Sequence, residues 1–158
     1  MTTPESPMVF LPICLNITGR RILVVGGGTA AVHKVGSLVR YTDAITVVAP
    51  GIDERIVKMG VECVHGEYAP AMLTDYGLVY ACTDDRAVNR RIRADAAARG
   101  ILANAADDPH SSDFVSPAIY RQGVMSVAVS SNATNVKQSI AWRDRIRKVF
   151  EDDSSEGH

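Results

Sequence analysis

Small residues at a fixed spacing, Gly26-x-Gly28-x-x-Ala31, directly follow a short apolar run at residues 22–25. This pattern is typical of the turn that binds a dinucleotide between a strand and a helix. Gly26 would permit the tight turn, Gly28 would let the backbone approach a pyrophosphate, and Ala31 would let the helix pack close to the strand. A helix that starts near Thr29 would direct its unpaired N–H groups at the phosphates.

Two polar clusters follow later expected strands. Asp107 and Asp108 precede Pro109, and Thr83-Asp84-Asp85 precedes a helix that we expect to begin near Arg86. Ligands bind at the carboxyl ends of parallel strands, so the clusters should face the crevice of the glycine turn. One carboxylate of the acid pair could remove a proton as general base while hydride leaves to the cofactor, or the pair could form only a turn. Residues 83–85 favour a helix N-cap, a role compatible with contact to the ribose.

The second expected strand ends in Val47-Val48-Ala49-Pro50-Gly51. Many NAD-binding chains carry an acid there, which holds the adenine ribose hydroxyls. This sequence has neither that acid nor an obvious nearby arginine for a 2′-phosphate. The residues by themselves therefore leave the choice between NAD and NADP open.

Strand and helix patterns alternate along the chain before Pro109. The expected strands are 22–25, 44–49, 61–65, 78–82 and one that begins at 101–103, and the expected helices are 29–41, 53–59 and 86–99. Strands separated by helices indicate right-handed βαβ units. We expect an α/β fold, a Rossmann-type doubly wound parallel sheet, followed by a β-rich dimerisation segment and a C-terminal helix.

The pattern changes after Pro109. Residues 114–120 and 124–130 predict a hairpin, and residues 136–150 predict an amphipathic helix. The expected division is an NAD-binding domain at 1–112, a dimerisation and substrate segment at 113–150, and a polar tail at 151–158. Because the apolar residues of the segment need cover, we expect a homodimer.

Composition indicates one ordinary soluble domain. The chain has 158 residues, 46% hydrophobic and 22% charged, with a formal net charge of −1. That charge argues against a nucleic-acid or membrane partner, and no apolar run approaches the roughly 20 residues of a membrane span. The N-terminus does not resemble a signal peptide, and the three scattered cysteines suggest a reducing compartment and no metal site. We expect a cytoplasmic protein.

Seven signatures in order resemble the precorrin-2 dehydrogenase family, the dehydrogenase module of siroheme synthases. They are Leu11-Pro12; Val24-Val25-Gly26-Gly27-Gly28 with Ala31, His33 and Lys34; Thr46-Val47-Val48-Ala49-Pro50; Ala81-Cys82-Thr83-Asp84-Asp85 with Asn89; Asn104 with Asp107-Asp108-Pro109; Phe114 with Pro117; and Val127-Ala128-Val129-Ser130-Ser131.

The resemblance implies an NAD-dependent oxidation of precorrin-2 to sirohydrochlorin in siroheme (porphyrin) biosynthesis. It makes Asp107 the proposed base. The implied cofactor-binding residues are Gly26, Gly27, Gly28, Thr29, Ala30, Ala49, Pro50, Thr83 and Asp84. The implied contacts to the tetrapyrrole substrate are Asp108, Ser130, Ser131 and Asn132.

Two alternatives remain open at this point. Family members usually continue after the double serine with Gly-Gly-x-Ser-Pro, whereas this chain has Asn132-Ala133-Thr134-Asn135-Val136. That difference favours a non-catalytic NAD-binding sensor. A bifunctional dehydrogenase and ferrochelatase is the other alternative, since some family members also insert metal into the product.

Overall fold

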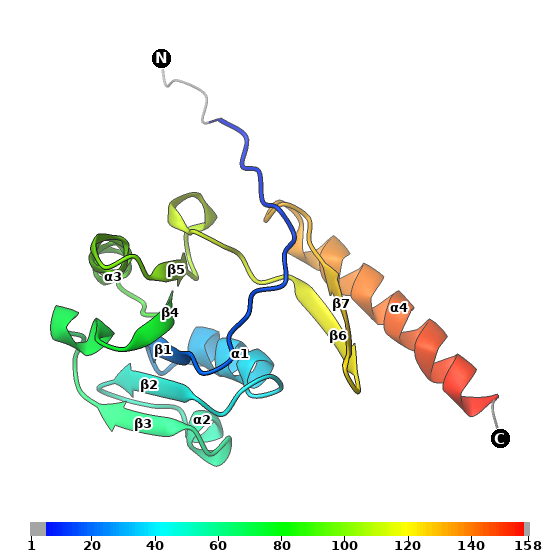
Figure 1. Ribbon diagram of the computed structural model, residues 1–158, viewed down its shortest axis with the longest axis horizontal. Coiled ribbons are helices and arrows are strands. Elements are labelled where there is room, and N and C mark those ends of the chain that lie inside the picture. Colours follow the sequence, from blue (N-terminus) through cyan, green and yellow to red (C-terminus); the bar gives the residue numbers. More distant parts are fainter. Residues whose placement is uncertain (1–5, 157–158) are drawn as a thin grey trace. The chain divides into compact units, whose positions relative to one another are not determined.

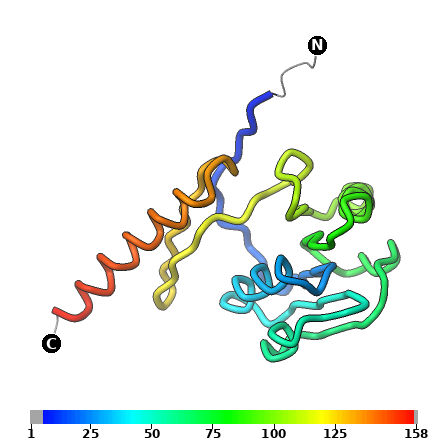
Figure 2. Tube along the Cα trace, turned by 180° about the vertical axis from the view of Figure 1, so that it is seen from behind, coloured from blue at the N-terminus to red at the C-terminus, as the bar shows by residue number. Residues whose placement is uncertain are grey.

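The computed structural model describes residues 6–156 and divides the chain into two compact units. The sheet unit comprises residues 15–114. The hairpin unit comprises residues 6–14 together with residues 115–156. Figure 1 labels the helices and strands of both units, and Figure 2 traces the same chain from behind.

Five parallel strands form the centre of the sheet unit, in the order β3-β2-β1-β4-β5 (Figure 1). The strands are β1 (Arg21–Val25), β2 (Ile45–Ala49), β3 (Glu62–His65), β4 (Tyr76–Ala81) and β5 (Leu102–Ala105). From β1 the chain builds outward through β2 to β3, and it then returns to the other side of β1 for β4 and β5. The strand order therefore reverses between β1 and β4, the point where open α/β sheets bind ligands. The predicted doubly wound sheet is confirmed.

The central strands are mostly apolar, as expected where both faces of a sheet are covered. Ile22 and Val24 pack on one face with α1 (Thr29–Leu38) and α2 (Glu54–Lys58). Leu23 and Val25 pack on the opposite face with α3 (Arg86–Ala98) and the 3₁₀ turn η1 (Pro70–Leu73). Successive strand residues thus enter two separate cores.

Helix α3 begins at the expected cap. The Asp85 carboxylate accepts hydrogen bonds from the backbone N–H groups of Ala87 at 2.8 Å and Val88 at 3.4 Å. The buried residues of α3 are Asn89, Ile92 and Ala96. Val88, which belongs to the expected apolar stripe, is partly exposed and lines a pocket. After β5, the short 3₁₀ turn η2 (Pro109–Ser111) follows the acid pair.

The hairpin differs from the predicted one in its boundaries. Strands β6 (Ala118–Gln122) and β7 (Met125–Val129) are antiparallel, and Gln122 pairs with Met125. The turn is therefore formed by Gly123 and Val124, with Gly123 at φ 59°, a conformation that favours glycine. Phe114 lies before β6 and belongs to the sheet unit, where its ring packs edge-on against Tyr80, with ring centroids 5.3 Å apart.

The C-terminal helix α4 (Val136–Ser155) extends five residues beyond the expected end at Phe150. The Asn135 side chain caps it by accepting a hydrogen bond from the N–H of Gln138 at 3.0 Å. Arg147 and Glu151 form an i,i+4 ion pair at 4.0 Å, which supports the helix across the expected boundary. The acidic residues that suggested a tail are therefore helical up to Ser155.

The N-terminal segment belongs to the hairpin unit through Asn132. The Asn132 side chain accepts a hydrogen bond from the N–H of Phe10 at 2.6 Å and donates one to the carbonyl of Met8. These residues are more than 120 positions apart in sequence. Among the helices described, none is long and apolar enough to cross a membrane.

Candidate functional site

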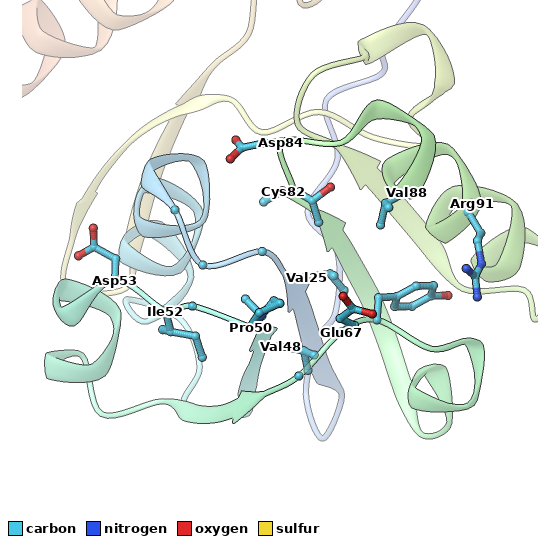
Figure 3. Close-up of a pocket in the computed structure, with 18 residues that line it drawn as sticks. Val25, Val48, Pro50, Ile52, Asp53, Glu67, Cys82, Asp84, Val88 and Arg91 are labelled. Carbon is cyan, nitrogen blue, oxygen red and sulfur yellow. The ribbon is translucent and has the colours of Figure 1, made fainter.

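A pocket of about 750 Å³ opens at the carboxyl ends of β1, β2 and β4. Val25, Val48 and Cys82 mark these three strand ends, and the loops that follow them form part of the wall (Figure 3). The pocket thus lies at the reversal of strand order. Its size is within the range of small-molecule and cofactor sites.

The glycine turn shapes the centre of this pocket. Gly26 has φ 120°, and a side chain there would overlap the carbonyl oxygen of Cys82. A side chain on Gly27 would overlap the carbonyl of Gly51 in the loop after β2. A Cβ on Gly28 would meet no atom within 4 Å, so the space above Gly28 belongs to the pocket.

Gly28 is the N-cap of helix α1, so the N-terminus of this helix points at that space. The first helical hydrogen bond runs from the N–H of Val32 to the carbonyl of Gly28 at 3.0 Å. The N–H groups before Val32 lack intrahelical acceptors and can bind the oxygens of a pyrophosphate. The open Gly28 cradle and this helix terminus fit a dinucleotide.

The loop after β2 forms one wall. It comprises Ala49, Pro50, Gly51, Ile52 and Asp53, and the N–H of Asp53 donates to the carbonyl of Gly27 at 2.8 Å. The Asp53 carboxylate forms a two-pronged contact with Arg55, at 3.0 and 2.9 Å. The hydrogen bond from the Arg55 side chain is the main cause that lowers the pKa of Asp53 to about 2. This loop is therefore pinned to the glycine turn, and the charge of Asp53 is compensated.

The opposite wall was not predicted from sequence. It contains Tyr68 from the loop after β3, and Val88 and Arg91 from α3. The Tyr68 hydroxyl donates to Asp95 at 2.8 Å, and burial raises the pKa of Tyr68. The Arg91 guanidinium lies 5.7 Å from the Tyr68 ring centroid and 3.9 Å from an Asp95 oxygen. The i,i+4 spacing of Arg91 and Asp95 was the one available sequence signal.

A buried amide connects Thr83 on the pocket rim with Asp107. The Asn89 side chain donates to the Thr83 carbonyl at 3.0 Å and to Asp107 Oδ1 at 3.1 Å, and it accepts from the Thr83 hydroxyl at 2.6 Å. Asp107 Oδ2 lies 3.6 Å from the Nε of Arg86, a largely exposed side chain. Asn89 therefore fixes one carboxylate oxygen of Asp107, a role that the sequence did not indicate.

The pocket wall includes a buried thiol, Cys82, and the half-buried Lys34 follows the glycine turn in α1. Burial lowers the pKa of Lys34, and burial raises the pKa of the Cys82 thiol to about 11. The Lys34 ammonium lies 5.8 Å from the ring centroid of Tyr80. No cluster of His, Cys, Asp or Glu within residues 6–156 could hold a metal ion.

The expected cofactor residues gather mostly in one place. Those that line the pocket are Gly26, Gly27, Gly28, Ala49, Pro50, Thr83 and Asp84. Thr29 and Ala30 are the first two residues of α1, next to the lining residue Gly28.

The expected substrate residues are in two different units. Asp108 caps η2, since its Oδ1 accepts from the N–H groups of His110 at 3.1 Å and Ser111 at 3.4 Å. Ser130, Ser131 and Asn132 belong to the hairpin unit. The Ser131 hydroxyl there accepts from the N–H of Asn135 at 2.9 Å, at the start of α4.

This chain is similar to known proteins over most of its length. A family model described as putative NAD(P)-binding matches residues 13–118, which include every residue that lines the pocket. The siroheme synthase of Chromobacterium violaceum is 40% identical over 147 residues, 90% of this chain and 31% of that protein. The siroheme synthase of Gluconacetobacter diazotrophicus is 36% identical over 149 residues, 89% of this chain and 32% of that protein. The chain thus spans about a third of the length of these curated relatives.

A solved structure supports the same likeness. SirC, a precorrin-2 dehydrogenase, superimposes with a TM-score of 0.70 at 25% identity, covering 94% of this chain and 71% of that one. The resemblance drawn from the sequence motifs is confirmed, as are the Rossmann-type fold and an NAD(P)-type dinucleotide cofactor.

Proposed function

This chain belongs to the putative NAD(P)-binding family, and on that premise we propose that it oxidises precorrin-2 to sirohydrochlorin with NAD, a step towards siroheme. The observation that carries the proposal is the link from the dinucleotide pocket through Thr83 and Asn89 to the Asp107 carboxylate. The likeness to a precorrin-2 dehydrogenase over 94% of the chain supports the substrate.

The pocket residues would bind and orient NAD, which accepts the hydride. Gly28 and the N-terminus of α1 would hold the pyrophosphate, with Thr29 and Ala30 contributing N–H groups. Ala49 and Pro50 would contact the adenosine side, and Thr83 and Asp84 would border the nucleotide at the end of β4. The chemistry then needs only a group that takes a proton from the substrate.

Asp107 is proposed as that base. Its Oδ1 is fixed by the Asn89 amide, while Oδ2 lies 3.6 Å from the Nε of the exposed Arg86, and we assign to Oδ2 the proton taken from a bound substrate. The Asp107 side chain is 28% exposed, which leaves it accessible. A carboxylate held at one oxygen and accessible at the other suits general base catalysis.

The tetrapyrrole contacts remain proposals. Asp108 binds the backbone of η2 through Oδ1, so we assign its contact with substrate to Oδ2. Ser130, Ser131 and Asn132 would contribute from the loop before α4. Asn132 is engaged with Met8 and Phe10, which makes its proposed role the placement of the N-terminal segment beside the two serines.

An absorbance assay with precorrin-2 and NAD tests the reaction. Wild-type protein should produce sirohydrochlorin, and Asp107→Asn should lower the rate about 10²- to 10⁴-fold, the usual contribution of a general base, while NAD affinity is retained. Asp43→Asn, an exposed site outside the pocket, is the matched control. Wild-type turnover by Asp107→Asn would reject Asp107 as the base. A protein that binds NAD but never forms sirohydrochlorin would favour the sensor function.

A homodimer through the hairpin unit is also proposed. Large apolar side chains are exposed on each of its parts, including Leu11 at 79% and Val124 at 92%. On α4, Trp142, Ile146 and Val149 line a shallow apolar depression. A second copy of the chain is the commonest cover for such a surface. The three free cysteines and the NAD cofactor support a cytoplasmic location.

A further inference from the structure

The wall of the dinucleotide pocket has a carboxylate in an unexpected position. The end of β2, where an acid commonly holds the adenine ribose, carries Ala49 and Pro50. Strand β3 lies next to β2, with His65 in register with Ala49, and the Gly66 N–H donates to the Ala49 carbonyl at 3.1 Å. The next residue is Glu67, and it lines the pocket.

Three acidic side chains line this pocket, and they differ in their positions and in their hydrogen-bond and ion-pair partners. Asp53, Asp84 and Glu67 stand on separate parts of the wall (Figure 3). Asp53 is paired with Arg55 and caps α2. Asp84 follows β4, across the pocket from the end of β2. For the Glu67 carboxylate, the described part of the chain records no hydrogen bond or ion pair.

Among the described residues that line the pocket, one side chain is cationic, and it already contacts other residues. Arg91 is the only lysine or arginine among the described residues that line the pocket. Its guanidinium lies over Tyr68 and beside Asp95, on the α3 side. A 2′-phosphate near the end of β2 would therefore meet the Glu67 carboxylate without a free cation beside it.

We infer that Glu67, from the loop after β3, holds the adenine ribose hydroxyls and excludes a 2′-phosphate, which makes the pocket selective for NAD over NADP. An ionised carboxylate accepts hydrogen bonds from the ribose 2′- and 3′-hydroxyls, and these bonds are stronger than neutral ones. The same charge repels a phosphate at the 2′ position. The inference rests on the proposed dehydrogenase function only for the use of a dinucleotide at this pocket.

Calorimetric titration of the full chain with NAD and with NADP tests this inference. Wild type should bind NAD more tightly than NADP. Glu67→Gln should reduce the ratio of the two affinities about tenfold or more, the expected effect of one charge-assisted contact. Glu67→Asp keeps the charge and should retain most of the selectivity. Glu67 is exposed in a loop, so these variants should fold.

The matched control is Glu54→Gln, which makes the same charge change on α2 at a side chain that is 81% exposed and outside the pocket. It should leave both affinities unchanged. An unchanged ratio in Glu67→Gln, or equal binding of NAD and NADP by wild type, would overturn the inference. Because precorrin-2 is absent from the titration, selectivity that disappears in Glu67→Gln supports the inference even for a protein that proves unable to oxidise precorrin-2.

Discussion

Replacement of Gly28 by valine should weaken NAD binding without disturbing the fold. Gly28 has φ −94° and ψ −160°, an extended conformation that any residue adopts, and a Cβ there meets no protein atom within 4 Å. The side chain would instead occupy the space in front of the α1 N-terminus. The substitution therefore separates the binding role of this glycine from any structural role.

The size of the effect follows from the hydrogen bonds at stake. The N–H groups that precede Val32 are available to phosphate oxygens, and a hydrogen bond to a charged group contributes about 1.5–3 kcal/mol. An isopropyl group over Gly28 should displace the pyrophosphate far enough to break at least one such bond. Because each 1.4 kcal/mol is about a tenfold change, NAD affinity should fall about 10- to 100-fold or more.

Isothermal titration with NAD measures this loss, and thermal unfolding checks the fold. Gly36→Ala is a suitable control, because Gly36 lies within α1 away from the pocket and its Cβ would make ordinary contact with Met59 at 3.7 Å. The control should gain about 0.5–1 kcal/mol of stability from better helix propensity and keep its NAD affinity. Unchanged NAD affinity in a folded Gly28→Val protein would refute the assignment of the pyrophosphate site.

Three further outcomes are expected. Asn89→Ala should lower kcat with little change in the KM for NAD, because Asp107 loses the hydrogen bond that positions it. The same variant should reduce the free energy of unfolding by about 1–3 kcal/mol for each buried group left unpaired. An unchanged kcat would contradict the positioning role of Asn89. Burial raises the pKa of the Cys82 thiol to about 11, so iodoacetamide at pH 8 should alkylate the exposed Cys14 first, and modification of Cys82, mapped by mass spectrometry, should rise only as the pH approaches 11. Light scattering should show a dimer at micromolar concentration and a shift toward monomer in Trp142→Lys, whereas a wild-type monomer would contradict the proposed dimer.

Local patterns were sufficient to predict the sheet unit. The apolar run that contains Ile22 and Leu23 leads into the glycine turn, and alternating strand and helix patterns give the order of elements. The same reasoning predicted the hairpin turn at residues 121–123, which is too early in the sequence, because these residues are typical of a turn. Pairing of Gln122 with Met125 moves the turn to Gly123 and Val124. Register depends on the partner strand, so it was the weaker part of the prediction.

The rest of the site depends on contacts between distant residues. Tyr68 reaches the pocket from the loop after β3 and Arg91 from α3, and no local sequence motif contains both residues. Asn89 lies among apolar residues on the buried side of α3, and hydrophobic periodicity cannot reveal a buried amide that is satisfied by Thr83 and Asp107. The long-range pairing of Asn132 with the N-terminal segment was undetectable for the same reason.

Gly27 shows that a sequence motif can locate a site without describing all the contacts that form it. The dinucleotide pattern leaves this position free, yet a side chain here would overlap the Gly51 carbonyl and crowd Ile52 in the loop after β2. That loop is held against the turn by the hydrogen bond from Asp53 to the Gly27 carbonyl. The turn after β1 and the loop after β2 therefore form one wall, and their close approach requires that Gly27 carry no side chain. The pocket is a property of two loops in contact, whereas the sequence motif records only one of them.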